Sequence, residues 1–379
     1  MRPLFPHWRD ALADLNSRGG HRKLRPPIGH DFSSNDYLGY GKIDIRDDNT
    51  MSQSGMASRL LRGDHPLWTQ VESELAIWHR GEAALIFNSG YVANEGLLSA
   101  VIEPDAWVAS DQFNHASIID GLRLAKATRF IYPHNDLGRL EEGLRSAASR
   151  TRFIVTESLF SMEGDVPPLA EIAALARRFD AHLIVDEAHA TGCFGATGGG
   201  LVDALGLRGE VLATMHTGGK ALGVPGAYVV GSSLLKEWLV NRCRHLIFTT
   251  ALPPRIAGWW LEALSRVAED RGARERLHAN AAAFRAKLFG HCDLLGSRYI
   301  VPIRIGDEAR TFAIAESLQA DGFDVRAIRP PTVPKGESRL RVSIHADHTA
   351  ELLDALVNRV IHSVNAGYPA SSAVRSPCS

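Results

Sequence analysis

The chain contains little cysteine. Its 379 residues include only four, Cys193, Cys243, Cys292 and Cys378, which are scattered without a Cys-x-x-Cys pair. Small extracellular domains depend on paired cysteines, and structural zinc modules bind their metal through closely spaced ones. The sequence therefore argues against a disulfide framework and a zinc module. We expect a reducing compartment and no bound metal.

The chain also lacks an excess of charge of either sign and long apolar runs. It has 42 basic and 43 acidic residues, a formal net charge of -1. This balance creates no general field that would attract nucleic acid or an anionic membrane. No run approaches the roughly 20 apolar residues of a membrane span, and residues 1–10 lack the apolar core of a secretory signal. We expect a cytoplasmic protein with no nucleic-acid or membrane partner.

What the chain does have is an alternation of strand-like and helix-like apolar segments. Short apolar runs are typical of buried strands, and recurrence at helical spacing is typical of helices. Their alternation predicts an α/β fold, a mainly parallel sheet with helices on both faces. The expected strands are 83–87, 106–110, 153–156, 182–185, 211–215 and 228–230, and the expected helices are 68–78, 117–128, 169–179 and a long helical region at about 255–289.

At this length we expect two packing units. Residues 46–270 would form a large domain, preceded by an Arg- and Pro-rich N-terminal arm at 1–45. Residues 271–365 would form a smaller C-terminal α+β domain, and the Ser-, Pro- and Ala-rich residues 366–379 a disordered tail. The expected elements of the smaller domain are strands at 299–305, 325–328 and 339–344 and helices at 310–319 and 350–364.

The first candidate site follows the strand expected at 182–185. Asp186 and His189 come directly after this apolar run, and ligands of parallel sheets bind beyond the carboxyl ends of strands. A carboxylate there can hold a pyridinium nitrogen protonated, which makes the ring an electron sink. His189 could reach a phenolic oxygen of the same ring. The bare pattern also fits a strand end with a polar turn.

Residues 186–189, Asp-Glu-Ala-His, also match the magnesium-binding box of helicases. Such enzymes need a phosphate loop, Gly-x4-Gly-Lys-Ser/Thr, ahead of the box. Here Gly219-Lys220 is followed by Ala221 and lies after residues 186–189. The nucleotide-binding interpretation fails on this missing geometry.

The second candidate site is the Gly-rich segment Thr217-Gly218-Gly219-Lys220. Glycines let a bulky planar group approach the backbone, and the Thr217 hydroxyl can donate to a phosphate. Lysines that form Schiff bases need such close packing. A lone lysine between glycines is more often simply solvated, so the segment by itself leaves both interpretations open.

Two more loops follow expected strands. Residues 88–94 open a helix after the strand at 83–87, so backbone N–H groups around Gly90 form an anion site that suits a phosphate. His115 follows the strand at 106–110, where an imidazole can stack on a planar ring. A plain strand-to-helix turn and a structural histidine are the alternatives. Four such signals at strand ends, in a fixed order, are together a much stronger indication than any one alone.

These segments resemble the α-oxoamine synthase family, fold-type I enzymes that depend on pyridoxal 5'-phosphate (PLP) and join an amino acid to an acyl-CoA with loss of carbon dioxide. The resemblance covers nearly the whole chain. It rests on residues 35–39, 57–59, 89–91, 115–117, 160–165, 186–189 and 217–220. Residues 328–336 and 339–341 narrow it to the branch that joins L-alanine to a pimeloyl thioester in biotin synthesis.

The resemblance implies the residues that hold PLP. Lys220 would carry it as a Schiff base and later remove the α-proton of the amino acid, and Asp186 would pair with the pyridine nitrogen. His115 would stack on the ring, and His189 with Ser161 would lie near the phenolic oxygen. Gly90, Tyr91 and Thr217 would serve the ring and the phosphate.

The resemblance also implies where the substrates and a second subunit bind. Arg341 would hold the amino-acid carboxylate as a bidentate pair that a lysine could not match, with Asn35 and His115 in the same substrate site. Thr332 would border the acyl chain, and Arg22 would meet the acyl or CoA end, although this basic stretch also fits a solvated surface. Thr250 would reach the phosphate of a neighbouring subunit, which implies a homodimer with shared active sites.

Two departures from the family pattern leave the acyl pocket open. The usual Gly-Ser-Gly-Ala-Ser-Arg appears here as Gln53-Ser54-Gly55-Met56-Ala57-Ser58-Arg59, and Gly-Gly precedes Lys220 where many relatives have a bulkier residue. Sister reactions that use glycine or serine with another acyl-CoA are therefore alternatives. A third alternative is a catalytically inert protein of the same fold that acts as a binding partner.

Overall fold

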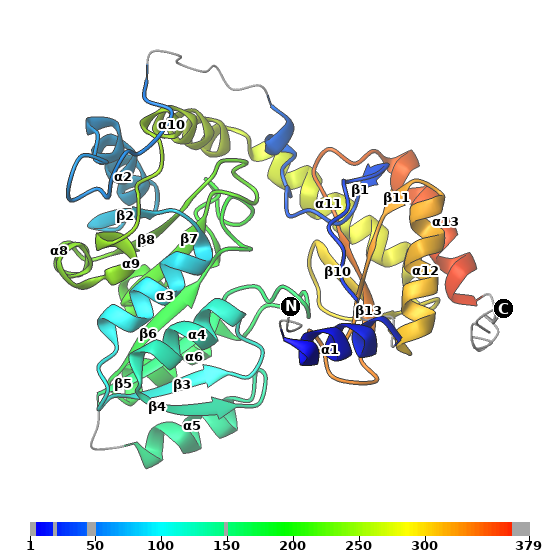
Figure 1. Cartoon of the computed structure of the whole chain (residues 1–379), viewed down its shortest axis with the longest axis horizontal. Coiled ribbons are helices and arrows are strands. Elements are labelled where there is room, and N and C mark those ends of the chain that lie inside the picture. The colour runs from blue at the N-terminus through cyan, green and yellow to red at the C-terminus, as the bar shows by residue number, and fades with distance from the viewer. Residues whose placement is uncertain (1–4, 18–20, 44–50, 148–150, 366–379) are drawn as a thin grey trace.

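The computed structural model describes residues 5–17, 21–43, 51–147 and 151–365. The predicted tail at 366–379 and parts of the predicted arm lie outside these residues. Figure 1 shows two lobes: one is built around the large sheet, and the other contains the C-terminal strands and helices. Among the described residues, none of the helices is both long and apolar enough to span a bilayer.

The large sheet has seven strands in the order β2-β8-β7-β6-β5-β3-β4. All neighbours from β7 to β4 run parallel, whereas β8 runs antiparallel to both β7 and β2. The predicted mainly parallel sheet is confirmed. The strands are β2 (Ala83–Phe87), β3 (Trp107–Asp111), β4 (Thr128–Tyr132), β5 (Arg152–Glu157), β6 (Ala181–Asp186), β7 (Ala213–Thr217) and β8 (Ala227–Gly231).

Both faces of this sheet are buried. Successive side chains of a strand point to opposite faces, and in β6 Leu183 and Val185 enter one hydrophobic core while Ile184 enters the other. This explains the continuous apolar runs in the sequence. The first core is covered by α2 (Pro66–Trp78), α5 (Leu137–Ser146), α6 (Leu169–Arg178), α7 (Leu201–Ala204) and α10 (Pro254–Glu269), and the second by α3 (Gly90–Val101), α4 (Ala116–Ala125), α8 (Ser233–Arg242) and α9 (Arg244–Ile247).

Some element boundaries differ from the prediction. The helix expected at 117–128 ends at Ala125, and Thr128 begins the unpredicted strand β4. The long helical region at 255–289 is two helices, α10 and α11 (Arg271–Leu288). They separate at Asp270, whose Oδ1 accepts a hydrogen bond from the backbone N–H of Ala273 at 2.8 Å and caps the second helix.

The smaller sheet has four antiparallel strands in the order β12-β13-β10-β9. These are β9 (Asp293–Leu294), β10 (Ile300–Gly306), β12 (Arg326–Ile328) and β13 (Ser338–Ser343), accompanied by α12 (Glu308–Ala320) and α13 (Ala350–Asn365). The arm joins this lobe through β1 (His30–Asp31), which pairs in parallel with β11 (Phe323–Asp324). The arm also contains α1 (Pro6–Ser17), which the sequence did not predict. Short 3-10 turns lie at Tyr40–Lys42 in the arm and at Arg208–Glu210 in the large lobe.

Candidate active site

The carboxyl ends of four strands of the large sheet carry most of the residues that the sequence singles out. β2 leads to Gly90, β3 to His115, β6 to Asp186 and β7 to Lys220, and their side chains meet in one cavity. Seven of the predicted site residues line it. The lining residues are Gly90, Tyr91, Asn94, His115, Ser117, Glu157, Asp186, Ala188, His189, Met215, Thr217 and Lys220.

Lys220 is the nucleophile that the cavity offers. Its Nζ lies 2.8 Å from Nε2 of His189. Burial lowers the pKa of Lys220 to about 8, although the carboxylates of Asp186 and Glu157 favour the charged amine. An amine with this pKa has a substantial neutral fraction near neutral pH, which nucleophilic attack and proton abstraction both require.

Asp186 is held rigidly at the end of β6 and is only 6% exposed. Its Oδ2 accepts from Nδ2 of Asn94 at 2.8 Å, and its Oδ1 accepts from the backbone N–H of Ala188 at 2.8 Å. The same Asn94 amide also donates to Ser117 Oγ at 2.9 Å. The carboxylate is therefore oriented before any ligand binds.

His115 serves as the N-cap of α4. Its Nδ1 accepts from the backbone N–H of Ser117 at 3.2 Å, so the neutral ring has its proton on Nε2. Its own backbone N–H donates to Oε1 of Glu157 at 2.6 Å. Burial lowers the pKa of His115, which keeps the ring neutral. A neutral flat ring fixed at its Nδ1 is suited to stacking.

The two glycines before Lys220 have different reasons to be there. A Cβ at Gly218 would lie 2.5 Å from the Trp260 ring, so packing alone requires glycine at this position. A Cβ at Gly219 would meet nothing closer than Thr217 Oγ1 at 4.0 Å. The sequence predicts that both glycines make room for a cofactor. This reason for glycine therefore remains only at Gly219.

The N-terminus of α3 offers an anion site. Ser89 caps this helix by accepting from the backbone N–H of Val92 at 3.4 Å, and Gly90 lies beside it in the cavity wall. Thr217 approaches from β7, and its hydroxyl donates to the Gly226 carbonyl at 3.3 Å. Unpaired N–H groups, the helix dipole and this hydroxyl match the needs of a phosphate.

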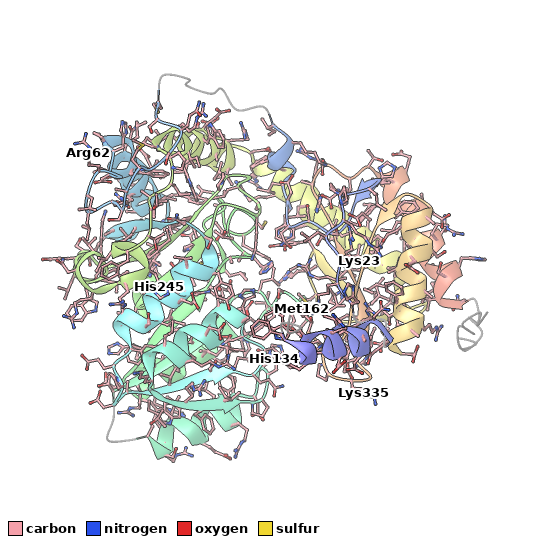
Figure 2. All side chains as sticks on the ribbon, in the orientation of Figure 1. Lys23, Arg62, His134, Met162, His245 and Lys335 are labelled. Atoms are coloured by element: carbon pink, nitrogen blue, oxygen red, sulfur yellow. The ribbon has the colours of Figure 1, made fainter. Side chains whose placement is uncertain are left out.

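A second cavity adjoins the first and shares His115, His189 and Lys220 with it. Arg341, on β13, lines this cavity from the smaller lobe, and Figure 2 shows Met162 of its wall between the two lobes. The remaining lining residues are Ser33, Asn35, Ser161, Arg326 and Ile328. Three more predicted site residues, Asn35, Ser161 and Arg341, are therefore brought to Lys220.

Arg341 is only 7% exposed and is fixed from three sides. Its Nε donates to the Ser161 carbonyl at 2.7 Å, one NH2 group donates to Asn35 Oδ1 at 3.0 Å, and the other donates to Ser343 Oγ at 3.0 Å. A guanidinium held in this way presents an oriented fork rather than a mobile charge.

The other three predicted residues lie outside these two cavities. The guanidinium of Arg22 is 3.4 Å from Thr332 Oγ1, which brings the arm to the loop after β12. Thr250 is exposed, and its carbonyl accepts from Nδ2 of Asn88 of the same chain at 2.8 Å. Thr250 is not among the described residues that line the Lys220 cavity of its own chain.

Several residues of the site were not predicted from the sequence. Glu157 ends β5 inside the cavity, and burial raises its pKa well above the ordinary value, an effect that Asp186 strengthens. Its position directly after an apolar strand was a usable signal. Asn94 lies within α3, and Tyr37, whose hydroxyl is 2.7 Å from His189 Nδ1, lies in an arm loop. Tyr37 lies in the motif 35–39 and Asn94 in the segment 88–94, but neither pattern gave these two residues a role in the site.

A cluster of His345, Asp347 and His348 lies apart from this site and brings three metal-binding residue types together. His348 Nδ1 accepts from the backbone N–H of His345 at 3.1 Å, and its Nε2 lies 2.8 Å from the Asp31 carbonyl. A carbonyl only accepts, so Nε2 carries the proton. His348 then has no free lone pair, and the cluster serves to join the arm to the smaller lobe.

The residues of the two cavities fit PLP. A buried carboxylate can face a pyridinium nitrogen, a neutral imidazole can lie over a ring, an amine can form a Schiff base, and the turn at Gly90 can bind a phosphate. The open space at Gly219 leaves room beside the amine. These features occur together at one edge of the sheet, which is the donor set that this cofactor requires.

Comparison with known proteins agrees with this reading. Residues 27–360 match the model of the family described as aminotransferase class I and II. The chain is 43% identical over 342 residues to an 8-amino-7-oxononanoate synthase of Chlorobaculum parvum, covering 86% of this chain and 87% of the relative. It is 44% identical over 368 residues to an 8-amino-7-oxononanoate synthase of Anaeromyxobacter dehalogenans, covering 91% and 92%.

Solved structures show the same fold. A serine palmitoyltransferase of Sphingomonas wittichii superposes with a TM-score of 0.88 at 24% identity, covering 95% of this chain and 98% of that one. An 8-amino-7-oxononanoate synthase of Francisella tularensis superposes with a TM-score of 0.74 at 26% identity, covering 89% and 98%. A serine palmitoyltransferase of S. paucimobilis, solved with PLP and myriocin bound, has a TM-score of 0.86 at 26% identity, covering 96% and 98%. The chain belongs to the class I and II aminotransferase family, among its PLP-dependent acyl-transferring enzymes of the 8-amino-7-oxononanoate synthase kind.

Proposed function

We propose that this enzyme condenses L-alanine with a pimeloyl thioester to give 8-amino-7-oxononanoate, the free thiol and carbon dioxide. A bond forms between the α-carbon of alanine and the thioester carbonyl carbon, the thiolate leaves, and the alanine carboxylate departs as carbon dioxide. The observation that carries the proposal is the oriented guanidinium of Arg341 in a cavity that also contains Lys220. A carboxylate bound there would bring its α-carbon to the amine.

Four groups would hold the cofactor. Lys220 would bind PLP covalently, Asp186 would keep its ring nitrogen protonated, His115 would lie over the ring, and the turn at Gly90 with Thr217 would bind the phosphate. When bound, PLP supplies an electron sink for the negative charge that develops at the α-carbon. The hydrogen bonds from Asn94 and Ala188 to Asp186 support this assignment because they aim the carboxylate into the cavity.

Lys220 would also move the α-proton. Its amine has a lowered pKa of about 8, which burial causes, so removing a proton from carbon is accessible to it. His189 is the nearest polar partner of the amine, at 2.8 Å. His189 would orient Nζ, and after the cofactor has bound it would lie near the phenolic oxygen together with Ser161.

The acyl thioester would enter along a basic groove beside the second cavity. Arg22, Lys23 and Arg25 of the arm line this groove together with residues of α12 and β12. Arg326 lines both the groove and the second cavity. Positive charge along this path suits an anionic acyl or thioester end, and we assign Arg22 and Thr332 to that end.

We further propose a homodimer in which Thr250 serves the site of the partner subunit. Thr250 is exposed on its own chain, and its neighbour Phe248 is 70% exposed. The backbone N–H of Ala251 bonds to the carbonyl of Ala57 at 2.9 Å, which joins this segment to the loop of Met56 and Leu61, 76% and 77% exposed. Large exposed apolar side chains on adjoining segments are typical of an interface.

The assay of the proposed reaction measures thiol release from pimeloyl-CoA with alanine, glycine or serine. We expect turnover with alanine and carbon dioxide in equal amount. Preference for glycine or serine would instead favour a sister reaction. A protein that binds PLP but releases no thiol with any of the three, or with other acyl-CoA substrates, would favour the inert binding alternative.

Cofactor attachment and the shared site have their own tests. Purified protein should show the absorbance of a PLP Schiff base, and Lys220→Ala should abolish it. Mixed dimers of Lys220→Ala and Thr250→Glu chains should regain activity, because one site then combines an intact Lys220 with an intact Thr250. Mixed dimers that stay inactive would contradict the assignment of Thr250 to the partner's site.

A further inference from the structure

A continuous chain of hydrogen bonds runs from Arg341 to Lys220. Arg341 donates to Asn35 Oδ1 at 3.0 Å, and the Tyr37 hydroxyl lies 2.9 Å from the same oxygen. The Tyr37 oxygen is also 2.7 Å from Nδ1 of His189, whose Nε2 is 2.8 Å from Nζ of Lys220. Tyr37 is the link between the residue that would bind the substrate carboxylate and the amine that would act on it.

The chemistry of each group fixes the direction of these hydrogen bonds. A guanidinium only donates and an amide oxygen only accepts, so the Tyr37 hydroxyl must donate its single proton to Asn35. The Tyr37 oxygen can then only accept from His189. His189 therefore carries its proton on Nδ1, and the lone pair of Nε2 accepts an N–H of Lys220.

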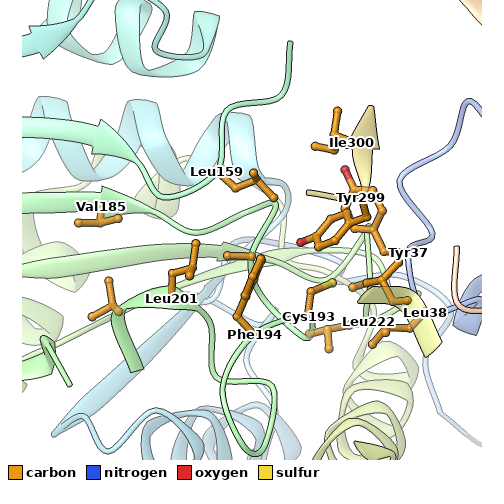
Figure 3. Close-up of a cluster of buried hydrophobic side chains, with 14 of the residues drawn as sticks. Tyr37, Leu38, Leu159, Val185, Cys193, Phe194, Leu201, Leu222, Tyr299 and Ile300 are labelled. Carbon is orange, nitrogen blue, oxygen red and sulfur yellow. The ribbon is translucent and has the colours of Figure 1, made fainter. Parts of the chain in front are cut away.

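The surroundings hold this arrangement in place. Tyr37 is fully buried, and its ring lies 4.7 Å from that of Tyr299, as the close-up of the core in Figure 3 illustrates. The Tyr299 hydroxyl donates to the backbone carbonyl of His189. Burial raises the pKa of Tyr37 above its ordinary value, and it lowers the pKa of His189 well below its own. Tyr37 thus keeps its proton, and His189 stays neutral.

We propose that Tyr37 is a positioning residue that fixes His189 as its Nδ1–H tautomer, so that Nε2 orients the amine of Lys220. One N–H of the amine is then held by His189, and the lone pair of the neutral amine is left to face the cavity. This inference deepens the proposed function and rests on it, because the value of an oriented amine lies in cofactor attachment and proton removal. The opposite tautomer would donate its Nε2–H to the neutral amine and occupy the lone pair that cofactor attachment and proton removal both need.

The test uses Tyr37→Phe, which keeps the ring against Tyr299 and removes only the hydroxyl. The matched control is Tyr299→Phe, which removes a buried hydroxyl bonded to the His189 backbone rather than to its ring. Nitrogen-15 NMR of histidine-labelled apoprotein reports the tautomer, and the His189 signal is assigned from a His189→Gln sample. We expect Nδ1–H in the wild type and in Tyr299→Phe, and a mixture or a switch to Nε2–H in Tyr37→Phe.

A second measurement follows PLP attachment to the apoprotein by absorbance as a function of pH. Loss of one hydrogen bond of ordinary strength should slow attachment about ten-fold in Tyr37→Phe and shift its pH profile, whereas Tyr299→Phe should keep the wild-type profile. An unchanged His189 tautomer with an unchanged profile in Tyr37→Phe would overturn the inference. Neither readout needs alanine or a thioester, so a failure of the proposed reaction would be seen separately.

Discussion

His134 joins two carboxylates, and the strength of that link can be measured through its dependence on pH. Its Nδ1 lies 2.9 Å from Asp111 and its Nε2 lies 2.9 Å from Asp165. Burial alone would lower the pKa of His134, but hydrogen bonds to both carboxylates outweigh burial and raise the pKa to about 10. The imidazolium thereby ties the end of β3 to the loop that supplies Ser161 to the second cavity.

We predict that His134→Asn lowers the free energy of unfolding most below pH 6.5 and progressively less toward pH 10. The ordinary pKa of histidine is 6.5, so between that pH and about 10 the native chain holds a proton that the unfolded chain has released. Stability from this proton is complete below pH 6.5 and is lost as pH rises, by about 1.4 kcal/mol per pH unit. The whole interval gives an upper value of about 5 kcal/mol.

The side chain of His134 is 14% exposed and that of Asp165 is 27% exposed, so solvent screens part of the attraction and we expect about 2 to 4 kcal/mol at pH 6. Urea unfolding of wild type and variant apoprotein at pH 6, 7.5 and 9, followed by tryptophan fluorescence at equal protein concentration, measures this difference. His291→Asn, at an exposed histidine, is the control and should show little difference at any pH. A His134→Asn effect that stays constant from pH 6 to 9 would refute the reasoning.

Three further predictions concern packing, acid stability and substrate binding. Gly218→Ala should lower the free energy of unfolding by about 1 to 3 kcal/mol because its Cβ would meet Trp260, whereas Gly219→Ala should unfold like the wild type and lose PLP affinity, as titration would show. Burial lowers the pKa of His79 to about 3, so its contribution to stability should be complete above pH 6.5 and lost as pH falls toward 3. The unfolding midpoint of His79→Gln should therefore change less with falling pH than that of the wild type. Arg341→Lys should raise KM for alanine about ten- to a hundred-fold by losing a bidentate pair, with KM for the thioester changed much less.

The sequence predicted the elements that its apolar pattern marks strongly. The strand at 83–87 has the bounds of β2, and the helix expected at 169–179 differs from α6 by one residue. The pattern is strong there because both faces of the sheet are buried. It is weak in β4, where Arg129 and Ile131 are exposed and only Tyr132 is buried, so this strand has no continuous apolar run.

The candidate site was predictable wherever a residue follows a strand. Lys220, Asp186 and His115 all do, and the fold brings them together because parallel strands end at one edge. Asn94 was not predictable in this way, because it lies in the interior of α3 and its partner Asp186 is 92 residues away in the sequence. Tyr37 depends equally on the tertiary fold: an arm loop becomes part of the site only by packing against the smaller lobe.

The arm has a consequence for the order in which the molecule is completed during synthesis. Ser33 donates to Asp324, 291 residues away, at 3.1 Å, and the backbone of the arm bonds to β13 and to the segment after it at Phe32 and Tyr37. A ribosome that has delivered the whole large sheet has therefore still not delivered the partners of the arm. Lys220 and Asp186 can be in place at that stage, but Asn35 and Tyr37 can dock only after the β13 segment emerges. The site should therefore be one of the last parts of the protein to form. Lys220 can capture the cofactor with its full set of neighbours only in the finished chain.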